Sequence, residues 1–291
     1  MFHLSSKLRP TMLLLFGITL WLCGCQSAQR SDREVLSVSI EPLRYVVEAI
    51  AGDKYEVHTL MPQGASPETY EPTPRQMMEL NHSVLLFRAG SLGFERTILP
   101  KMAENAPEVQ MVDLGEGIRP IYDADHSHDG SDSMDPHTWM STDNLRTMAQ
   151  NACTALCLRD SVNADYFRQR LALFDRSMDQ LDTALATELK PLEQRAFLIY
   201  HPALGYFARQ YGLQQLSVEH DGKEPSAHRM QQLLSTCRAQ GVSVVFVSKE
   251  HRGEAARRMA DELKAKLVVI NPLDYDVSAQ MQAIAKALNH E

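Results

Sequence analysis

Short apolar runs alternate with amphipathic helical stretches along most of this chain. Helical spacing is clear in Leu43–Ala51, Pro74–Leu80, Arg229–Gln240 and Gly253–Lys264. This alternation predicts parallel sheets covered by helices, and nearly continuous apolar runs are typical of strands buried on both faces. The predicted strands are Leu36–Ile40, Glu56–Met61, Ser83–Phe87, Val109–Val112, Ala196–Tyr200, Gln215–Val218, Val242–Val247 and Leu267–Ile270.

A purely helical region separates the first four predicted strands from the last four. Asn144–Arg159 predicts one helix, and the apolar spacing from Asn163 to about Leu189 predicts a second, which Pro191 ends. The second helix would be about 40 Å long, enough to run along both sets of strands. We therefore expect an α/β fold of two lobes, each with a mainly parallel sheet flanked by helices, joined by one long spine helix. The predicted limits are 36–160, 161–190 for the linking helix, and 191–291.

The N-terminal segment predicts export and a lipid anchor. Residues 1–24 have a basic start and an apolar run, Met12–Cys23, that is shorter than the roughly 20 residues of a membrane-spanning helix. The run leads into Leu-Cys-Gly-Cys, which resembles a bacterial lipobox and implies cleavage before Cys25 and acylation of its sulfur. A plain signal peptide with an incidental cysteine is the alternative. Residues 25–35 would then be a tether, and the protein would lie in the cell envelope, facing the periplasm or exterior.

Composition narrows the expected partners. The chain has a net charge of −8 and no basic stripe, which argues against nucleic acid as a partner. Beyond the lipobox cysteine, Cys25, only Cys153, Cys157 and Cys237 remain, so no disulfide framework and no Cys-x-x-Cys metal site is predicted. We expect a monomer.

Candidate metal ligands lie where predicted strands end. Ligands of open parallel sheets collect beyond the carboxyl ends of the strands, and imidazoles with carboxylates are the usual ligand set for zinc and its first-row neighbours. One histidine, His137, lies instead between an Asp-Pro turn and a helix start at Ser141. The candidates are Glu68 in a Pro/Gly loop, His137 in Asp135-Pro136-His137, His201 directly after Ala196–Tyr200, and Asn271 and Asp274 after Leu267–Ile270.

These motifs resemble those of the zinc/manganese solute-binding receptors of bacterial ABC importers, the ZnuA/TroA type. The resemblance covers Leu36 to Leu288. In that family a Pro-His-x-Tyr-Glu-Pro loop gives the first ligand, and here Glu68 replaces its histidine. The Asp-Pro-His motif gives the second ligand, His137, and a histidine followed by Tyr-Phe gives the third, His201. The fourth ligand, where the family uses one, is an aspartate opening a segment like Asp-Pro-Leu, and that position is Asn271 here.

The resemblance implies a receptor that captures zinc, with manganese as the alternative, between two lobes. It would deliver the metal to an ABC permease and its ATPase. Asn271, Asp274 or a water would complete the ligand set. His126 and His128, in the loop 123–134, would form an auxiliary metal-collecting pair. Oxygen ligands favour manganese and imidazoles favour zinc, and we expect zinc because two histidine ligands remain.

Two other functions use similar residues. Two histidines and a glutamate are also the ligand set of zinc hydrolases, but neither a His-Glu-x-x-His nor a Gly-x-Ser-x-Gly motif occurs, so we do not expect an enzyme. A lipoprotein adhesin with a structural metal remains open, because related receptors look alike in sequence.

A spine helix should permit only small closure of the lobes. Metal affinity should fall below about pH 6.5, where imidazoles take up protons.

Overall fold

The computed structural model describes residues 33–122, 134–219, 226–249 and 254–289. Residues 34–291 form one compact unit. Cys25, the tether up to residue 32, His126 and His128 lie outside the described residues, so their predicted roles stay predictions. Within the described part of the chain, no helix is long and apolar enough to cross a membrane.

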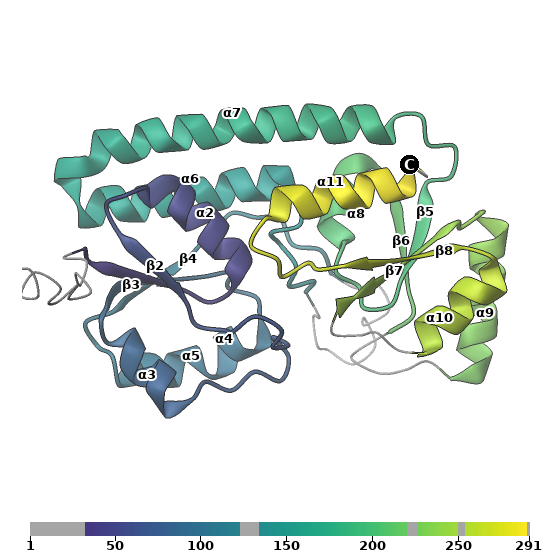
Figure 1. Cartoon of the computed structure of the whole chain (residues 1–291). Helices are drawn as coiled ribbons and strands as arrows, with labels where there is room; N and C mark the ends of the chain where they lie inside the picture. The colour runs from purple at the N-terminus through teal and green to yellow at the C-terminus, as the bar shows by residue number, and fades with distance from the viewer. Residues whose placement is uncertain (1–32, 123–133, 220–225, 250–253, 290–291) are drawn as a thin grey trace, which may run out of the picture. The chain divides into compact units, whose positions relative to one another are not determined.

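The first lobe is built on a four-stranded parallel sheet in the order β2-β1-β3-β4. Its two inner strands, β1 and β3, are mostly apolar and carry a core that includes Leu36, Val38 and Phe87. Helices pack beside the sheet (Figure 1). The elements are β1 (Val35–Val38), α2 (Glu41–Ala51), β2 (Glu56–Thr59), α3 (Pro74–Leu80), β3 (Ser83–Arg88), α4 (Gly93–Thr97), α5 (Leu99–Glu104) and β4 (Gln110–Asp113).

The second lobe repeats this arrangement with a parallel sheet in the order β6-β5-β7-β8. All five residues of β7 are buried, as the continuous apolar run predicts. In each sheet the first strand pairs on both sides, so the strand order reverses next to β1 and β5, and such points are where α/β sheets bind ligands. The elements are β5 (Ala196–Ile199), α8 (Gly205–Tyr211), β6 (Gln214–Ser217), α9 (Ala227–Ala239), β7 (Val244–Ser248), α10 (Glu254–Leu263), β8 (Lys266–Ile270) and α11 (Val277–Leu288).

A long helix joins the lobes. Helix α6 (Thr142–Arg159) and the short η3 (Ser161–Asn163) lead into α7 (Ala164–Leu189), whose 26 residues span about 39 Å. Helix α7 buries an apolar stripe against α2 and α6 of the first lobe and α11 of the second (Figure 1). The stripe consists of Phe167, Phe174, Met178, Leu181, Leu185 and Leu189.

The predicted fold class is therefore confirmed. All eight strands begin and end within two residues of their predicted limits, and the two helices of the linking region do the same. The pattern gives no predicted range for α4, α5, α8 and α11. The proposed domain limits stay predictions.

Candidate metal site

The predicted ligands Glu68, His137 and His201 line one cavity of about 280 Å³. Glu68 comes from the loop after β2, His137 from the segment between β4 and α6, and His201 from the end of β5. The cavity thus collects side chains that lie 69 and 64 positions apart in sequence. Its remaining walls are largely apolar and come from Leu92, Gly93, Pro136, Ala203, Pro272 and Leu273, with Ser66, Pro67 and Ser248 beside them.

His201 is held by a buried carboxylate. Its Nδ1 lies 3.1 Å from Oε2 of Glu219, whose side chain is only 7% exposed. Burial lowers the pKa of His201, but the hydrogen bond and charge of Glu219, with the charges of Glu68 and Asp135, outweigh burial and raise the pKa overall. When Nδ1 donates to Glu219, the lone pair of the neutral ring is on Nε2, which faces the cavity.

His137 is oriented in the same way by Asp135. Oδ1 of Asp135 accepts from the backbone N–H of His137 and lies 2.9 Å from its Nδ1, so one oxygen fixes both the turn and the ring. The turn leads into α6, which is capped by Ser141 as predicted, since its hydroxyl accepts from the N–H of Asn144. Nε2 of His137 is therefore also directed at the cavity.

The two Nε2 atoms approach each other to 3.3 Å. In a tetrahedral site, two nitrogens each about 2.0–2.1 Å from zinc would be about 3.3–3.4 Å apart. Two lone pairs facing each other repel unless a cation or a proton lies between them. The spacing and the two carboxylate-bound Nδ1 atoms thus suit a pair of histidine ligands to one metal ion.

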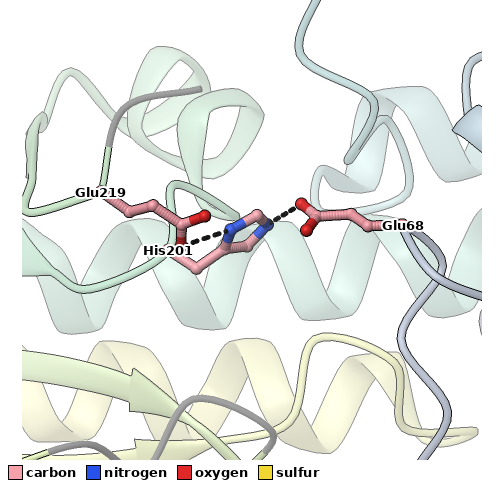
Figure 2. A group of neighbouring side chains, drawn as sticks. All are labelled: Glu68, His201 and Glu219. Atoms are coloured by element: carbon pink, nitrogen blue, oxygen red, sulfur yellow. Dashed lines mark hydrogen bonds and ion pairs between the residues drawn. The ribbon is translucent and has the colours of Figure 1, made fainter. Parts of the chain in front are cut away.

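Glu68 and Glu219 lie on opposite sides of the His201 ring (Figure 2). Oε1 of Glu68 is 3.7 Å from Nε2, on the cavity side. Among the described residues, the acidic, histidine and cysteine groups that converge within 4.8 Å of one another are Glu68, His201 and Glu219. One ion cannot contact both ring nitrogens, so we assign Glu219 to orienting the ring and Glu68 to the metal side. Glu68, whose side chain is 51% exposed, has room to rotate towards His137.

Asn271 and Asp274 do not line the cavity that holds Glu68, His137 and His201. They line a neighbouring cavity with Lys249, and the amide of Asn271 is engaged locally. Its Oδ1 accepts from the N–H of Leu273, and its Nδ2 donates to Oδ2 of Asp274 at 3.1 Å. Between them, Pro272 and Leu273 reach the first cavity. The structure therefore does not bring Asn271 or Asp274 together with the histidines.

Contacts between the lobes brace the site. The indole N–H of Trp139 donates to the carbonyl of Pro272 at 2.7 Å, beside His137. The Tyr206 hydroxyl of α8 donates to the carbonyl of Asp135 at 3.1 Å. Because both bonds hold segments that carry site residues, the ligand positions depend on packing between the lobes.

Sequence reasoning missed the role of Glu219. It follows β6 as His201 follows β5, so its place at the shared carboxyl edge was a readable signal. The same holds for Asp135, which the sequence placed in the turn but not on Nδ1 of His137.

Known proteins resemble this chain over most of its length. A family model described as the periplasmic component A of zinc-uptake complexes, ZnuA, matches residues 36–289. The Bacillus subtilis "High-affinity zinc uptake system protein ZnuA" is 26% identical over 87% of this chain and 84% of its own length. The Streptococcus pneumoniae "Manganese ABC transporter substrate-binding lipoprotein PsaA" is 26% identical over 84% of this chain and 81% of its own. A crystal structure of ZnuA has a TM-score of 0.83 at 31% identity and covers 89% of this chain and 99% of that one.

The match to the family model spans both lobes and every described residue of the candidate site. The chain belongs to the ZnuA family of periplasmic zinc-uptake components.

Proposed function

We propose that this protein captures zinc outside the cytoplasmic membrane and delivers it to an ABC permease with its ATPase. The observation that carries the proposal is the pair of histidines, His137 and His201, whose Nε2 atoms face each other at 3.3 Å while carboxylates hold their Nδ1 atoms. Glu68 supplies the anionic ligand. Relatives named for zinc and for manganese uptake support capture of a divalent transition metal.

Zinc is the better fit to this ligand set. Two imidazoles suit zinc, whereas manganese prefers carboxylate, carbonyl and water oxygens. Glu68 is one carboxylate, and Asn271, at the position of the family's fourth ligand, uses its amide within its own turn. Manganese is the alternative metal, and Asn271 or Asp274 would reach it only after that turn rearranges.

The ligand assignment is tested by titrating the metal-free protein with zinc and manganese. His137→Ala and His201→Ala should each weaken zinc binding by more than about a hundredfold, because loss of an outer-shell partner alone costs about 10–100-fold. Glu68→Ala should weaken it less, since this half-exposed side chain has to rotate to bind. His58→Ala is the matched control, because His58 is an exposed histidine paired with Glu56 at 2.7 Å, away from the cavity. Parent-like zinc affinity in all three ligand variants would show that the site is wrong.

Transport is favoured over hydrolysis by the role of the carboxylates. A zinc hydrolase needs a general base beside the metal-bound water. Asp135 and Glu219 instead contact the Nδ1 atoms, on the far side of the rings from the cavity. Zinc-dependent peptide or ester cleavage that disappears in His201→Ala would overturn this choice.

A lipid anchor at Cys25 would hold the receptor near its permease. Relatives named as lipoproteins support this location. Cys25→Ser should move the full chain from the membrane fraction to the soluble envelope fraction. Continued membrane association of that variant would refute the anchor.

Delivery to a permease is tested separately by zinc uptake in cells that lack the protein. Unchanged uptake in those cells would refute delivery.

A further inference from the structure

The cavity at the metal site is larger than a metal ion and one water require. Its volume is about 280 Å³, whereas a water in the liquid occupies about 30 Å³. Leu92, Pro136, Ala203 and Leu273 give it apolar walls. Apart from Ser66, Ser248 and the proposed ligands, the lining offers waters few hydrogen bonds, so it suits a small organic molecule better than a hydrated ion.

The ligand set leaves room for an outside donor. Glu68, His137 and His201 offer three ligand atoms, and zinc in proteins is almost always four-coordinate. Asn271, at the position of the family's fourth ligand, has its side-chain amide hydrogen-bonded to Leu273 and Asp274. The fourth donor can therefore come from a molecule that enters the cavity.

Gly93 lines the cavity at a position where a side chain can be added. It is the first residue of α4. It is not among the glycines with positive φ, and a Cβ at this position would meet no atom within 4 Å. Neither backbone conformation nor packing requires glycine here. A larger side chain can therefore be introduced at this cavity-lining position without displacing packed atoms.

The charge around the site indicates which donor fits. Three carboxylates, of Glu68, Asp135 and Glu219, act on or through the ligands. Against a dication with neutral imidazoles they leave one net negative charge. Another anion would meet repulsion in a partly buried cavity, whereas a neutral nitrogen donor adds no charge and suits zinc.

We propose that the cavity admits a small neutral nitrogen donor of the imidazole class as the fourth ligand, so that the metal is bound together with one co-ligand. This inference rests on the proposed metal-capture function. It assigns the apolar cavity, and Gly93 in its wall, to selecting the co-ligand.

The test uses the full chain loaded with Co²⁺, whose visible absorption reports its coordination, and imidazole as the probe. Imidazole should change the spectrum of the parent in a saturable way. Gly93→Leu should still bind one Co²⁺ but require at least about tenfold more imidazole, about 1.4 kcal/mol, while Gly93→Ala should lie between the two. Acetate, a small anion, should bind more weakly than imidazole.

An unchanged parent spectrum, an equal response in Gly93→Leu, or tighter binding of acetate would each overturn the inference. If Gly93→Leu failed to bind Co²⁺, zinc-edge X-ray absorption of the parent would decide. Three imidazole ligands in the presence of the probe would support the co-ligand, and two would refute it. Metal binding without a co-ligand would refute the co-ligand inference but leave the proposed function standing. Parent-like zinc binding by the ligand variants would refute both.

Discussion

The carboxylate of Glu219 is predicted to make His201 a better metal ligand. It lies 3.1 Å from Nδ1 of His201, and its side chain is only 7% exposed. In Glu219→Gln the amide oxygen can still accept from Nδ1, so the ring keeps its orientation while the charge is lost. This substitution therefore separates the electrostatic contribution of Glu219 from its geometric one.

At pH 8 the variant should bind zinc about 10–100-fold more weakly, which is the usual effect of losing an outer-shell partner and equals about 1.4–2.7 kcal/mol. The difference should shrink as the pH falls. Burial lowers the pKa of His201, but Glu219 is the main cause that raises it overall, so a proton competes with the metal in the parent. Without that charge the pKa falls, and the variant loses less of its affinity in acid.

The metal-free protein should show the converse effect on stability. A raised pKa in the folded state stabilises the fold fully below the unfolded pKa of about 6.5, and this contribution is lost as the pH rises through the folded pKa. Glu219→Gln removes most of it. The unfolding free energy of the metal-free variant should therefore fall further below that of the parent at pH 5.5 than at pH 8, as measured by urea denaturation.

The binding assay is competition with a chromophoric zinc chelator at pH 8, 7 and 6. The matched control is Glu56→Gln, because the Glu56 carboxylate lies 2.7 Å from Nε2 of His58 on the surface and should not affect zinc binding. Equal affinities of Glu219→Gln and the parent at pH 8, or a ratio that grows as the pH falls, would refute the reasoning.

Three further outcomes are expected. Tyr275, in the loop before α11, donates a hydrogen bond of 2.7 Å to Glu48 of α2. Tyr275→Phe removes this bond between the lobes and should lower the unfolding free energy in urea by about 1 kcal/mol; an unchanged midpoint would show that the bond does not stabilise the fold. Asn271→Asp loses the donor to Asp274 and adds a like charge, so calorimetry should show a lower Tm without metal and a larger rise with Mn²⁺ than in the parent; equal rises would contradict this. Zinc at a free concentration of a hundred times its Kd should raise the parent's unfolding free energy by about 2.7 kcal/mol, and a rise that does not depend on zinc concentration would argue against binding to the folded state.

The fold could be predicted because its main elements carry strong periodic signals. Strand β7 is buried at every position and reads as a continuous apolar run, and α7 repeats its apolar positions over seven turns. Helix α4 has only five residues, too few for a period to appear, and α8, which is as short as α3, lacks the proline that marks the start of α3 at Pro74. Their positions are set by the loops and side chains around them, which a local pattern does not contain.

The site was only partly predictable for a related reason. His201 could be found because it follows a strand directly, but its partner depends on strand register. Ile199 pairs with Ser217, and the pairing continues as the N–H of Glu219 donates to the carbonyl of Tyr200. That register places His201 and Glu219 side by side beyond the sheet. A sequence shows both residues but not the alignment of the two strands.

The two departures from the family ligand pattern compensate each other in charge. The resemblance implies three histidines and, where a fourth ligand is used, one aspartate, hence one anion beside the metal. Here Glu68 replaces a histidine and Asn271 replaces the aspartate, which again leaves one anion. In the proposed ligand set the anion is a half-exposed side chain of the first lobe, whereas Asn271 of the second lobe is held by Leu273 and Asp274. The proposed set therefore has the same charge for attracting a dication, and its side chains held by buried or partly buried carboxylates are His137 and His201. Because both of these held side chains are imidazoles, this arrangement favours zinc over manganese.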